Sequence, residues 1–162
     1  MWRIFCVLWG LAGFWPCLSN GQVPQQPPKI MMINFGGNDC PPCMNWRRFE
    51  LPKLQAEPMF RSIEFVHVEK TIQSAVPPMF FLPDTVKPLK DKLDAASGGM
   101  AGSPQVAIIV NGEVYDYSWG ARTSDDVLKM IKAIQTNTPY PFERCLKRRD
   151  RRHCDIAGDP GR

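Results

Sequence analysis

The stretch that decides the fold is KIMMINFGGNDCPPC, residues 29–43 of the 162-residue chain. Its apolar first half, which ends at Phe35, is typical of a buried strand. The turn that follows is expected to lead into a helix capped by Asn38 or Asp39. A C-x-x-C motif would then lie at the helix N-terminus, directly after the strand.

Two cysteines in this position form the physical basis of a dithiol redox site. Cys40 and Cys43 can pair as a disulfide, and unpaired N–H groups and the helix dipole favour thiolate over thiol. Pro41 and Pro42 fit a first helical turn, where N–H groups have no helical partner, and they stiffen the loop. We expect a reactive, exposed pair, with a structural disulfide that never turns over as the alternative.

The N-terminal segment predicts the compartment. Residues 1–21 have a charged start, a short apolar core and a small or polar end, as a secretory signal requires. We therefore expect a periplasmic or secreted protein, with an uncleaved N-terminal membrane anchor as the alternative. Removal of the signal leaves four of the six cysteines, an even number suited to an oxidising compartment. Residues 22–28 are polar and proline-rich, and we expect an extended lead-in.

The chain ends in a basic segment, residues 138–162, which holds the other two of these four cysteines. A stabilising disulfide between Cys145 and Cys154 is expected, and an electron relay to the active pair is the alternative. A zinc site that combined them with His153 and the C-x-x-C is disfavoured by the unusual spacing, so no metal is expected. The positive charge is interpreted as a solvated tail rather than a nucleic-acid or lipid surface.

Residues 29–137 are expected to form one α/β domain. Apolar periodicity and turn signals predict the order strand–helix–strand–helix–strand–strand–helix. Asn111 and Gly112 form a strong hairpin signal. After the first helix, the predicted elements are a strand at 63–68, a helix at 84–96, strands at 105–110 and 114–119, and a helix from Thr123 or Ser124.

Side-chain spacing predicts which residues of these elements are buried. The first helix is expected to bury Met44, Trp46, Phe49 and Leu54 and to kink or break at Pro52. The second is expected to bury Val86, Leu89 and Leu93, and the last Val127, Ile131 and Ile134. Strict alternation along the last strand would put Tyr115, Tyr117 and Trp119 on one face.

This arrangement resembles the thioredoxin fold over roughly residues 29–135. Ser103 and Pro104 directly precede the central strand, where that family has a cis-proline against its dithiol. Gly112 and Gly120 follow at the spacing of the thioredoxin hairpin. The resemblance implies a thioredoxin-like three-layer sandwich around a central mixed sheet, with βαβ-α-ββα order.

The resemblance also implies roles for individual residues. Cys40 would attack a substrate disulfide and Cys43 would resolve the mixed disulfide, without any metal or organic cofactor. Pro104 in the cis form would keep the backbone beside it free to pair with a substrate strand, and Ser103 would touch the sulfur and the peptide. Pro42 before the second cysteine is typical of reducing thioredoxins, which favours a reductant.

The sequence departs from the family pattern at two positions near the dithiol. Asn34 stands where thioredoxin has a buried aspartate, so another proton acceptor is needed, and Glu64 or Glu69 is the candidate. Asp39 replaces a tryptophan, and its charge opposes thiolate formation at Cys40 unless the neighbouring arginines, Arg47 and Arg48, offset it. His67 is interpreted as an ordinary strand residue.

A third departure is an insertion at about residues 71–97, which contains the apolar run 76–83. We expect it to pack over the sheet, with a partner-docking surface as the alternative. The sequence thus predicts an exported thiol–disulfide oxidoreductase that acts on protein substrates together with a redox partner protein, and not on nucleic acid. The competing hypothesis is a redox-inactive thioredoxin-fold binding module of an envelope assembly or secretion system.

Overall fold

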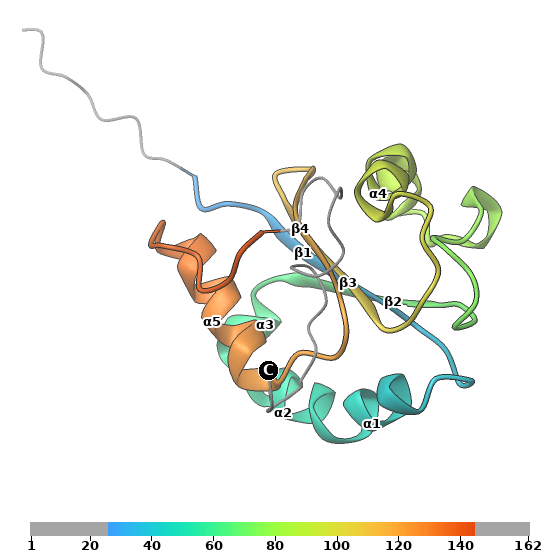
Figure 1. Cartoon of the computed structure of the whole chain (residues 1–162). Coiled ribbons are helices and arrows are strands. Elements are labelled where there is room, and N and C mark those ends of the chain that lie inside the picture. The colour runs from blue at the N-terminus through green and yellow to red at the C-terminus, as the bar shows by residue number, and fades with distance from the viewer. Residues whose placement is uncertain (1–25, 145–162) are drawn as a thin grey trace, which may run out of the picture.

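The computed structural model describes residues 26–144. Within them lies a four-stranded mixed sheet in the order β2-β1-β3-β4 (Figure 1). The central strand β1 (Ile30–Gly36) runs parallel to β2 (Glu64–Glu69) and antiparallel to β3 (Gln105–Val110). Strand β4 (Glu113–Trp119) pairs antiparallel with β3. The predicted mixed sheet and the predicted order of strands along the chain are confirmed.

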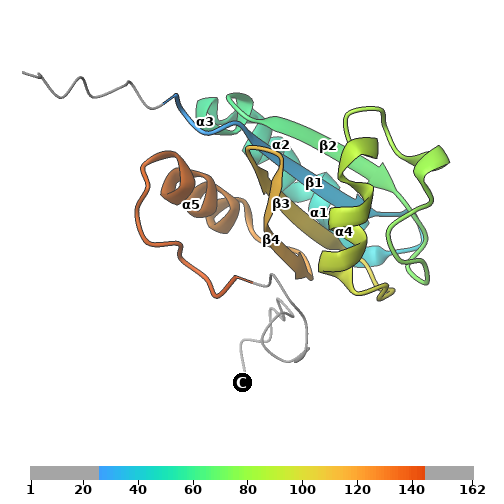
Figure 2. The ribbon, with the colours of Figure 1, turned by 90° about the horizontal axis from the view of Figure 1, so that it is seen from above.

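Helices cover both faces of this sheet. Four helices lie on one face: α1 (Pro41–Phe49), α2 (Leu51–Ala56), α3 (Pro58–Arg61) and α5 (Ser124–Gln135). The other face is covered by α4 (Lys90–Ser97) and the 3₁₀ turn η2 (Lys87–Leu89), while the 3₁₀ turn η1 (Met79–Phe81) in the same part of the chain buries none of its residues. Figure 2 shows α4 and α5 on opposite sides of the strands. The described residues therefore form the expected three-layer α/β sandwich.

The central strand β1 is buried along its whole length because both of its faces contact apolar residues. Met31, Ile33 and Phe35 pack into the cluster on the α4 side. Ile30 and Met32 pack into the cluster on the α5 side. A strand covered in this way needs apolar residues at nearly every position rather than at alternate ones. This explains the apolar run that precedes the cysteines, in which Asn34 is the one polar residue.

The last strand differs from the prediction at Tyr115. Ile108 pairs with Asp116 and Ile109 with Val114, so Tyr115 is an extra residue in a β-bulge. Because of that extra residue, the alternation shifts. Tyr115 packs in the α5-side cluster, whereas Tyr117 and Trp119 belong to the α4-side cluster. The expectation that the three aromatic residues share one face is wrong.

Two predicted helices are shorter than expected. The first ends at Phe49, and the break falls at Glu50 rather than at Pro52. Met44 and Phe49, expected in the core, are 41% and 55% exposed. Pro88 lies in η2, so the helix expected at 84–96 begins only at Lys90. Proline cannot donate the hydrogen bond that a helix interior requires.

Segment 71–97 packs its spaced apolar residues against the α4 face of the sheet. These residues are Val76, Leu82, Val86, Leu89 and Leu93. The three residues of η1 point away from this cluster, and Phe80 is 86% exposed. The segment therefore covers the sheet while presenting one apolar turn to solvent.

Several predictions concern residues that lie outside the described part of the chain. They are the secretion signal at 1–21, most of the lead-in at 22–28 and the tail beyond Arg144, with Cys145, His153 and Cys154. No helix between residues 26 and 144 has both the length and the apolar character that are needed to cross a membrane.

Candidate functional site

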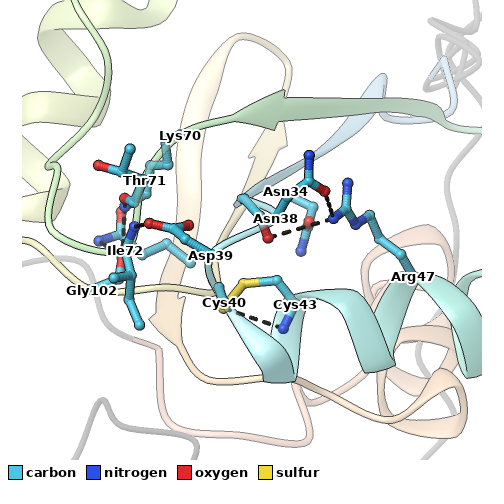
Figure 3. Close-up of a disulfide and its surroundings, with 12 residues drawn as sticks. Asn34, Asn38, Asp39, Cys40, Cys43, Arg47, Lys70, Thr71, Ile72 and Gly102 are labelled. Atoms are coloured by element: carbon cyan, nitrogen blue, oxygen red, sulfur yellow. Dashed lines mark hydrogen bonds between the residues drawn. A yellow bond between two sulfur atoms is a disulfide. The ribbon is translucent and has the colours of Figure 1, made fainter.

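The C-x-x-C motif forms a disulfide at the N-terminus of α1 (Figure 3). Cys40 itself is the helix cap, and its Sγ accepts a hydrogen bond of 3.2 Å from the Cys43 backbone N–H. Pro41 and Pro42 occupy the first two helical positions and have no N–H to donate. The first free N–H of the helix is therefore that of Cys43, and it is directed at the sulfur of Cys40.

The capping prediction is wrong because Asn38 and Asp39 have other partners. The Asn38 side chain donates to Glu69. It also accepts from Arg47, and Asp39 accepts the backbone N–H of Ile72 at 2.9 Å (Figure 3). These partners lie on a helix and on the second strand and its following loop. The turn before the dithiol is thus held by the Arg47 side chain of α1, by Glu69 of β2 and by the loop after β2, and not by a cap at the start of α1.

Both sulfur-bearing residues are buried in the disulfide form. Cys40 is 0% exposed and Cys43 is 2% exposed, whereas Pro41 and Pro42 between them are exposed. The expectation of an exposed pair is wrong for this form. Any reaction of Cys40 with a second protein would therefore require its sulfur to become accessible.

Two glycines allow the chain to pass close to the dithiol. A Cβ atom at Gly36 would lie 2.8 Å from Cys43 Sγ, and one at Gly37 would lie 2.1 Å from the carbonyl oxygen of Lys70. Both separations are shorter than real Cβ contacts. Glycine is required at these positions so that the end of β1 can pack directly against Cys43 and Lys70.

Lys70 is a buried cation on the Asp39 side of the dithiol. Its Nζ donates to the carbonyl oxygens of Ser74 and Gly102, both at 2.6 Å. Burial lowers the pKa of Lys70 to about 8, and the Asp39 carboxylate opposes that shift. Lys70 therefore ties the loop after β2 to the segment before β3, and its charge faces Asp39.

The arginines expected to offset Asp39 contact other groups. Arg47 bonds Asn38 Oδ1 at 2.6 Å, and its NH1 lies 3.5 Å from His67 Nε2. The guanidinium of Arg48 lies over the ring of Phe49. The structure therefore assigns the electrostatic partner of Asp39 to Lys70, which the sequence analysis did not single out.

Asn34 lies in the centre of the sheet, 3% exposed, opposite His67 on β2. Its Oδ1 lies 3.0 Å from His67 Nδ1. The two candidate proton acceptors are engaged elsewhere, because Glu69 bonds Asn38 and Glu64 pairs with Lys29 at 3.9 Å. The titratable group in contact with Asn34 is thus the imidazole of His67.

Ser103 and Pro104 lie at the same end of the sheet as the dithiol. Gln105 pairs with Phe35, so the antiparallel course of β3 places Pro104 level with Gly36. The Ser103–Pro104 peptide bond is cis, and the carbonyl oxygen of Pro104 accepts the Gly120 N–H at 2.9 Å. Ser103 Oγ is buried and has no hydrogen-bond partner within residues 26–144.

A cleft of about 390 Å³ opens beside Pro42. It is lined by α1 and by the loop between β4 and α5, and its residues include Trp46, Phe49 and Arg122. Trp46 Nε1 donates to the carbonyl oxygen of Arg122 at 2.7 Å, which joins the two walls. The half-exposed ring of Phe49 gives this cleft an apolar surface next to the motif.

No family model and no curated protein match the chain. Among solved structures, it is similar to thioredoxin-2, a component of malaria parasite protein secretion machinery (16% identity, TM-score 0.42, 65% of this chain and 82% of that one). It is also similar to Chlamydomonas reinhardtii thioredoxin f2 (21% identity, TM-score 0.41, 78% of this chain and 91% of that one). A third similar structure is that of the C-terminal domain of Neisseria meningitidis DsbD in the reduced form (20% identity, TM-score 0.38, 65% of this chain and 81% of that one).

The fold assignment rests on the connections and register of the chain itself. A parallel βαβ unit leads through α4 into an antiparallel hairpin and a final helix, with helices on both sheet faces. The disulfide follows the central strand at its C-terminal end, where sites of α/β sheets collect. The described residues have a thioredoxin-like fold that carries a C-x-x-C disulfide at the start of its first helix.

Proposed function

We propose that this protein is a thiol–disulfide oxidoreductase that exchanges the Cys40–Cys43 pair with disulfides of other proteins. The single observation that supports this most is the placement of the pair. It lies at a helix N-terminus, directly after the central strand, with the Cys43 N–H directed at Cys40 Sγ. Backbone donors and the helix dipole at this position stabilise a thiolate, the form that attacks disulfides.

In the reducing direction, the Cys40 thiolate attacks one sulfur of a substrate disulfide. The substrate S–S bond breaks, and its other sulfur leaves as a thiolate that takes up a proton. Cys43 then loses its proton and attacks Cys40 Sγ, which closes the protein disulfide and releases the second substrate thiolate. Two electrons pass from the dithiol to the substrate, so a redox partner protein must supply them again.

We infer that reduction is the favoured direction. Pro41 and Pro42 leave α1 with fewer N–H donors near the sulfur of Cys40. Neither residue offers the positive charge that a histidine between the cysteines would supply. A less stabilised thiolate makes the dithiol a better reductant.

The substrate side of the proposal uses the segment before β3 and the cleft beside Pro42. Ser103 and Pro104 lie level with the end of β1, so a bound peptide could pair there while it contacts the dithiol. The partially exposed Phe49 and the cleft walls would accept apolar substrate side chains. The N-terminal sequence pattern supports export to a periplasm or secretion as part of the same proposal.

The burial of both cysteines favours a second candidate, a redox-inactive thioredoxin-fold binding module. In that protein the disulfide would hold the start of α1 to its loop and would never be exchanged. The exposed apolar turn at Phe80 and Phe81 would then be available for a partner.

Catalysed reduction of insulin disulfides by dithiothreitol tests the two candidates. The full chain is used with Cys6, Cys17, Cys145 and Cys154 replaced by serine, so that only the pair in the motif can react. We expect turnover that Cys40→Ser abolishes, while Cys43→Ser accumulates a mixed disulfide that mass spectrometry detects. If the folded chain shows no turnover and Cys43→Ser traps no substrate, the binding module is the better description.

A further inference from the structure

The backbone carbonyl group of Gly102 accepts hydrogen bonds from two buried side chains. Lys70 Nζ donates to its oxygen at 2.6 Å, and Gln105 Nε2 donates at 2.9 Å. The exposed fractions of these two residues are 6% and 0%. A carbonyl oxygen has two lone pairs, so the two donors fill its accepting capacity. We name Lys70 and Gln105 the Gly102 clamp.

Each donor of the Gly102 clamp is itself held by a further hydrogen bond. The Tyr117 hydroxyl donates to Gln105 Oε1 at 2.6 Å, so the amide nitrogen of Gln105 faces the carbonyl groups of Gly102 and Met100. Lys70 Nζ also donates to the carbonyl oxygen of Ser74 at 2.6 Å. The Gly102 carbonyl is therefore fixed by side chains whose own orientation is set.

The ammonium group of Lys70 bonds carbonyl oxygens rather than a carboxylate. Its acceptors within residues 26–144 are the carbonyl groups of Thr71, Ser74 and Gly102, and Asp39 acts on it through charge alone. Burial of a cation among neutral partners costs free energy, and burial lowers the pKa of Lys70 to about 8. Methionine has a similar length and would fill the space without that cost. The cation is therefore better explained by the carbonyl groups that it orients than by stability.

The Gly102 clamp determines the direction of the Ser103 N–H. The peptide bond between Gly102 and Ser103 is trans, so its C=O and N–H groups point in opposite directions. Because the carbonyl is held toward Lys70 and Gln105, the Ser103 N–H points away from them. Within residues 26–144, neither this N–H nor the buried Ser103 Oγ has a hydrogen-bond partner. A buried polar atom without a partner is uncommon and indicates a site that a ligand completes.

The same segment is joined to the turn that carries Cys40. The Gly102 N–H donates to the carbonyl oxygen of Ile72 at 2.9 Å, and the Ile72 N–H donates to Asp39 Oδ2 at 2.9 Å. Figure 3 shows Ile72 and Gly102 beside Asp39, which directly precedes Cys40. Both backbone groups of Gly102 are thus engaged, and the position of the Ser103 N–H relative to Cys40 is fixed.

We propose that the Gly102 clamp positions the Ser103 N–H to donate to a backbone carbonyl of an extended peptide whose cysteine is bonded to Cys40. The inference rests on the proposed exchange with protein disulfides and assigns the ligand to the class of extended polypeptide segments. Lys70 and Gln105 act through the Gly102 peptide group and are positioning residues. A small disulfide without a peptide backbone gains nothing from the clamp.

Three substitutions separate the clamp from a general loss of stability. Lys70→Met and Gln105→Met each remove one donor to Gly102 and keep an apolar side chain of similar length. Lys92→Met is the matched control because Lys92 also donates to a backbone carbonyl, that of Gly112 at 2.7 Å, in the hairpin after β3. Circular dichroism confirms that each variant is folded, and Gln105→Met decides if Lys70→Met is not folded.

The first readout is amide hydrogen exchange at Ser103, measured by NMR in a mixed disulfide. Cys43 and the four cysteines outside the motif are replaced by serine. A peptide with one cysteine, activated as its thionitrobenzoate disulfide, is then added. The Cys40 thiolate attacks the peptide sulfur, the activated S–S bond breaks, and thionitrobenzoate leaves with the electron pair.

We expect bonding of the peptide to slow exchange at Ser103 by about tenfold, the size of one new hydrogen bond. Lys92→Met should show the same slowing, whereas Lys70→Met and Gln105→Met should lose most of it. The proposal is overturned if no mixed disulfide forms, if exchange is not slowed, or if all the chains show equal slowing.

The second readout compares insulin with hydroxyethyl disulfide, using chains that retain both cysteines of the motif. Lys70→Met and Gln105→Met should lower kcat/KM for insulin by about tenfold and leave that for the small disulfide unchanged. An equal loss on both substrates would mean that the clamp only supports the fold, and no loss on either contradicts the proposal. A chain that shows the slowed exchange but reduces neither substrate disproves the proposed function alone.

Discussion

Gly36→Ala tests the close packing between the central strand and the dithiol. The added methyl group would lie 2.8 Å from Cys43 Sγ and 3.0 Å from Cys43 Cβ, so one of the two residues must move. Overpacking of this kind costs about 1–3 kcal/mol. Alanine recovers about 0.5–1 kcal/mol because glycine is unfavourable within a strand. We therefore expect a net destabilisation of about 1–2 kcal/mol.

The assay is urea unfolding, carried out with reductant present, in a cycle of Gly36→Ala, Cys43→Ala and the double variant. Removing Cys43 Sγ eliminates the closer of the two contacts, so the double variant should be more stable than the sum of the single effects. A favourable coupling of about 1 kcal/mol supports the packing described above. Free energies of unfolding that add to within about 0.5 kcal/mol would refute it.

Three further predictions concern residues around the dithiol and the segment that covers the sheet. Between pH 8 and 10.5 the unfolded chain retains a proton that folded Lys70 has released, so the contribution of Lys70 to stability should rise with pH across that window. Urea titrations at several pH values should show that the free energy of unfolding rises less with pH in Lys70→Met than in the unsubstituted chain. An equal rise in the two chains would contradict this. Trp46→Phe should cost about 1–2 kcal/mol in thermal unfolding because the Arg122 carbonyl loses its donor, and an unaltered melting temperature would show that water replaces it. Phe80→Ser should change stability by less than about 0.5 kcal/mol, whereas Leu93→Ala should cost about 2–5 kcal/mol, and similar losses for both would mean that the exposed turn is packed.

The fold could be predicted because its strongest signals are local. A buried strand needs an almost continuous apolar run, and the run up to Phe35 has that form except at Asn34. The Asn111–Gly112 turn requires positive φ at both residues, and both have it, with φ of 52° and 81°. The prolines and the cysteines of the motif mark the start of α1 with equal clarity.

The parts that could not be predicted depend on contacts between distant segments. Asn38 and Asp39 are both good capping residues, but Glu69 and Ile72 bind them across the sheet end. The bulge at Tyr115 arises from the pairing of β3 with β4. The alternation of aromatic and polar residues along β4 does not indicate it.

The surroundings of the dithiol were missed for the same reason. His67 lies opposite Asn34 because of the parallel register of β1 and β2. Neither residue, taken alone, indicates that pairing. Lys70 follows a strand and carries no motif, and only its burial and its bonds to carbonyl groups single it out. A polar residue in an apolar strand, as Asn34 is, was the one available signal.

The reduction potential of the Cys40–Cys43 pair, measured against glutathione in the folded chain with the other cysteines replaced, tests the central claim most directly. A thiol–disulfide oxidoreductase that favours reduction should equilibrate reversibly at a value near that of thioredoxin, about −270 mV. A value near −120 mV would reverse the proposed direction. A disulfide that neither glutathione nor dithiothreitol opens while the chain stays folded would contradict the account, and the binding module would replace it.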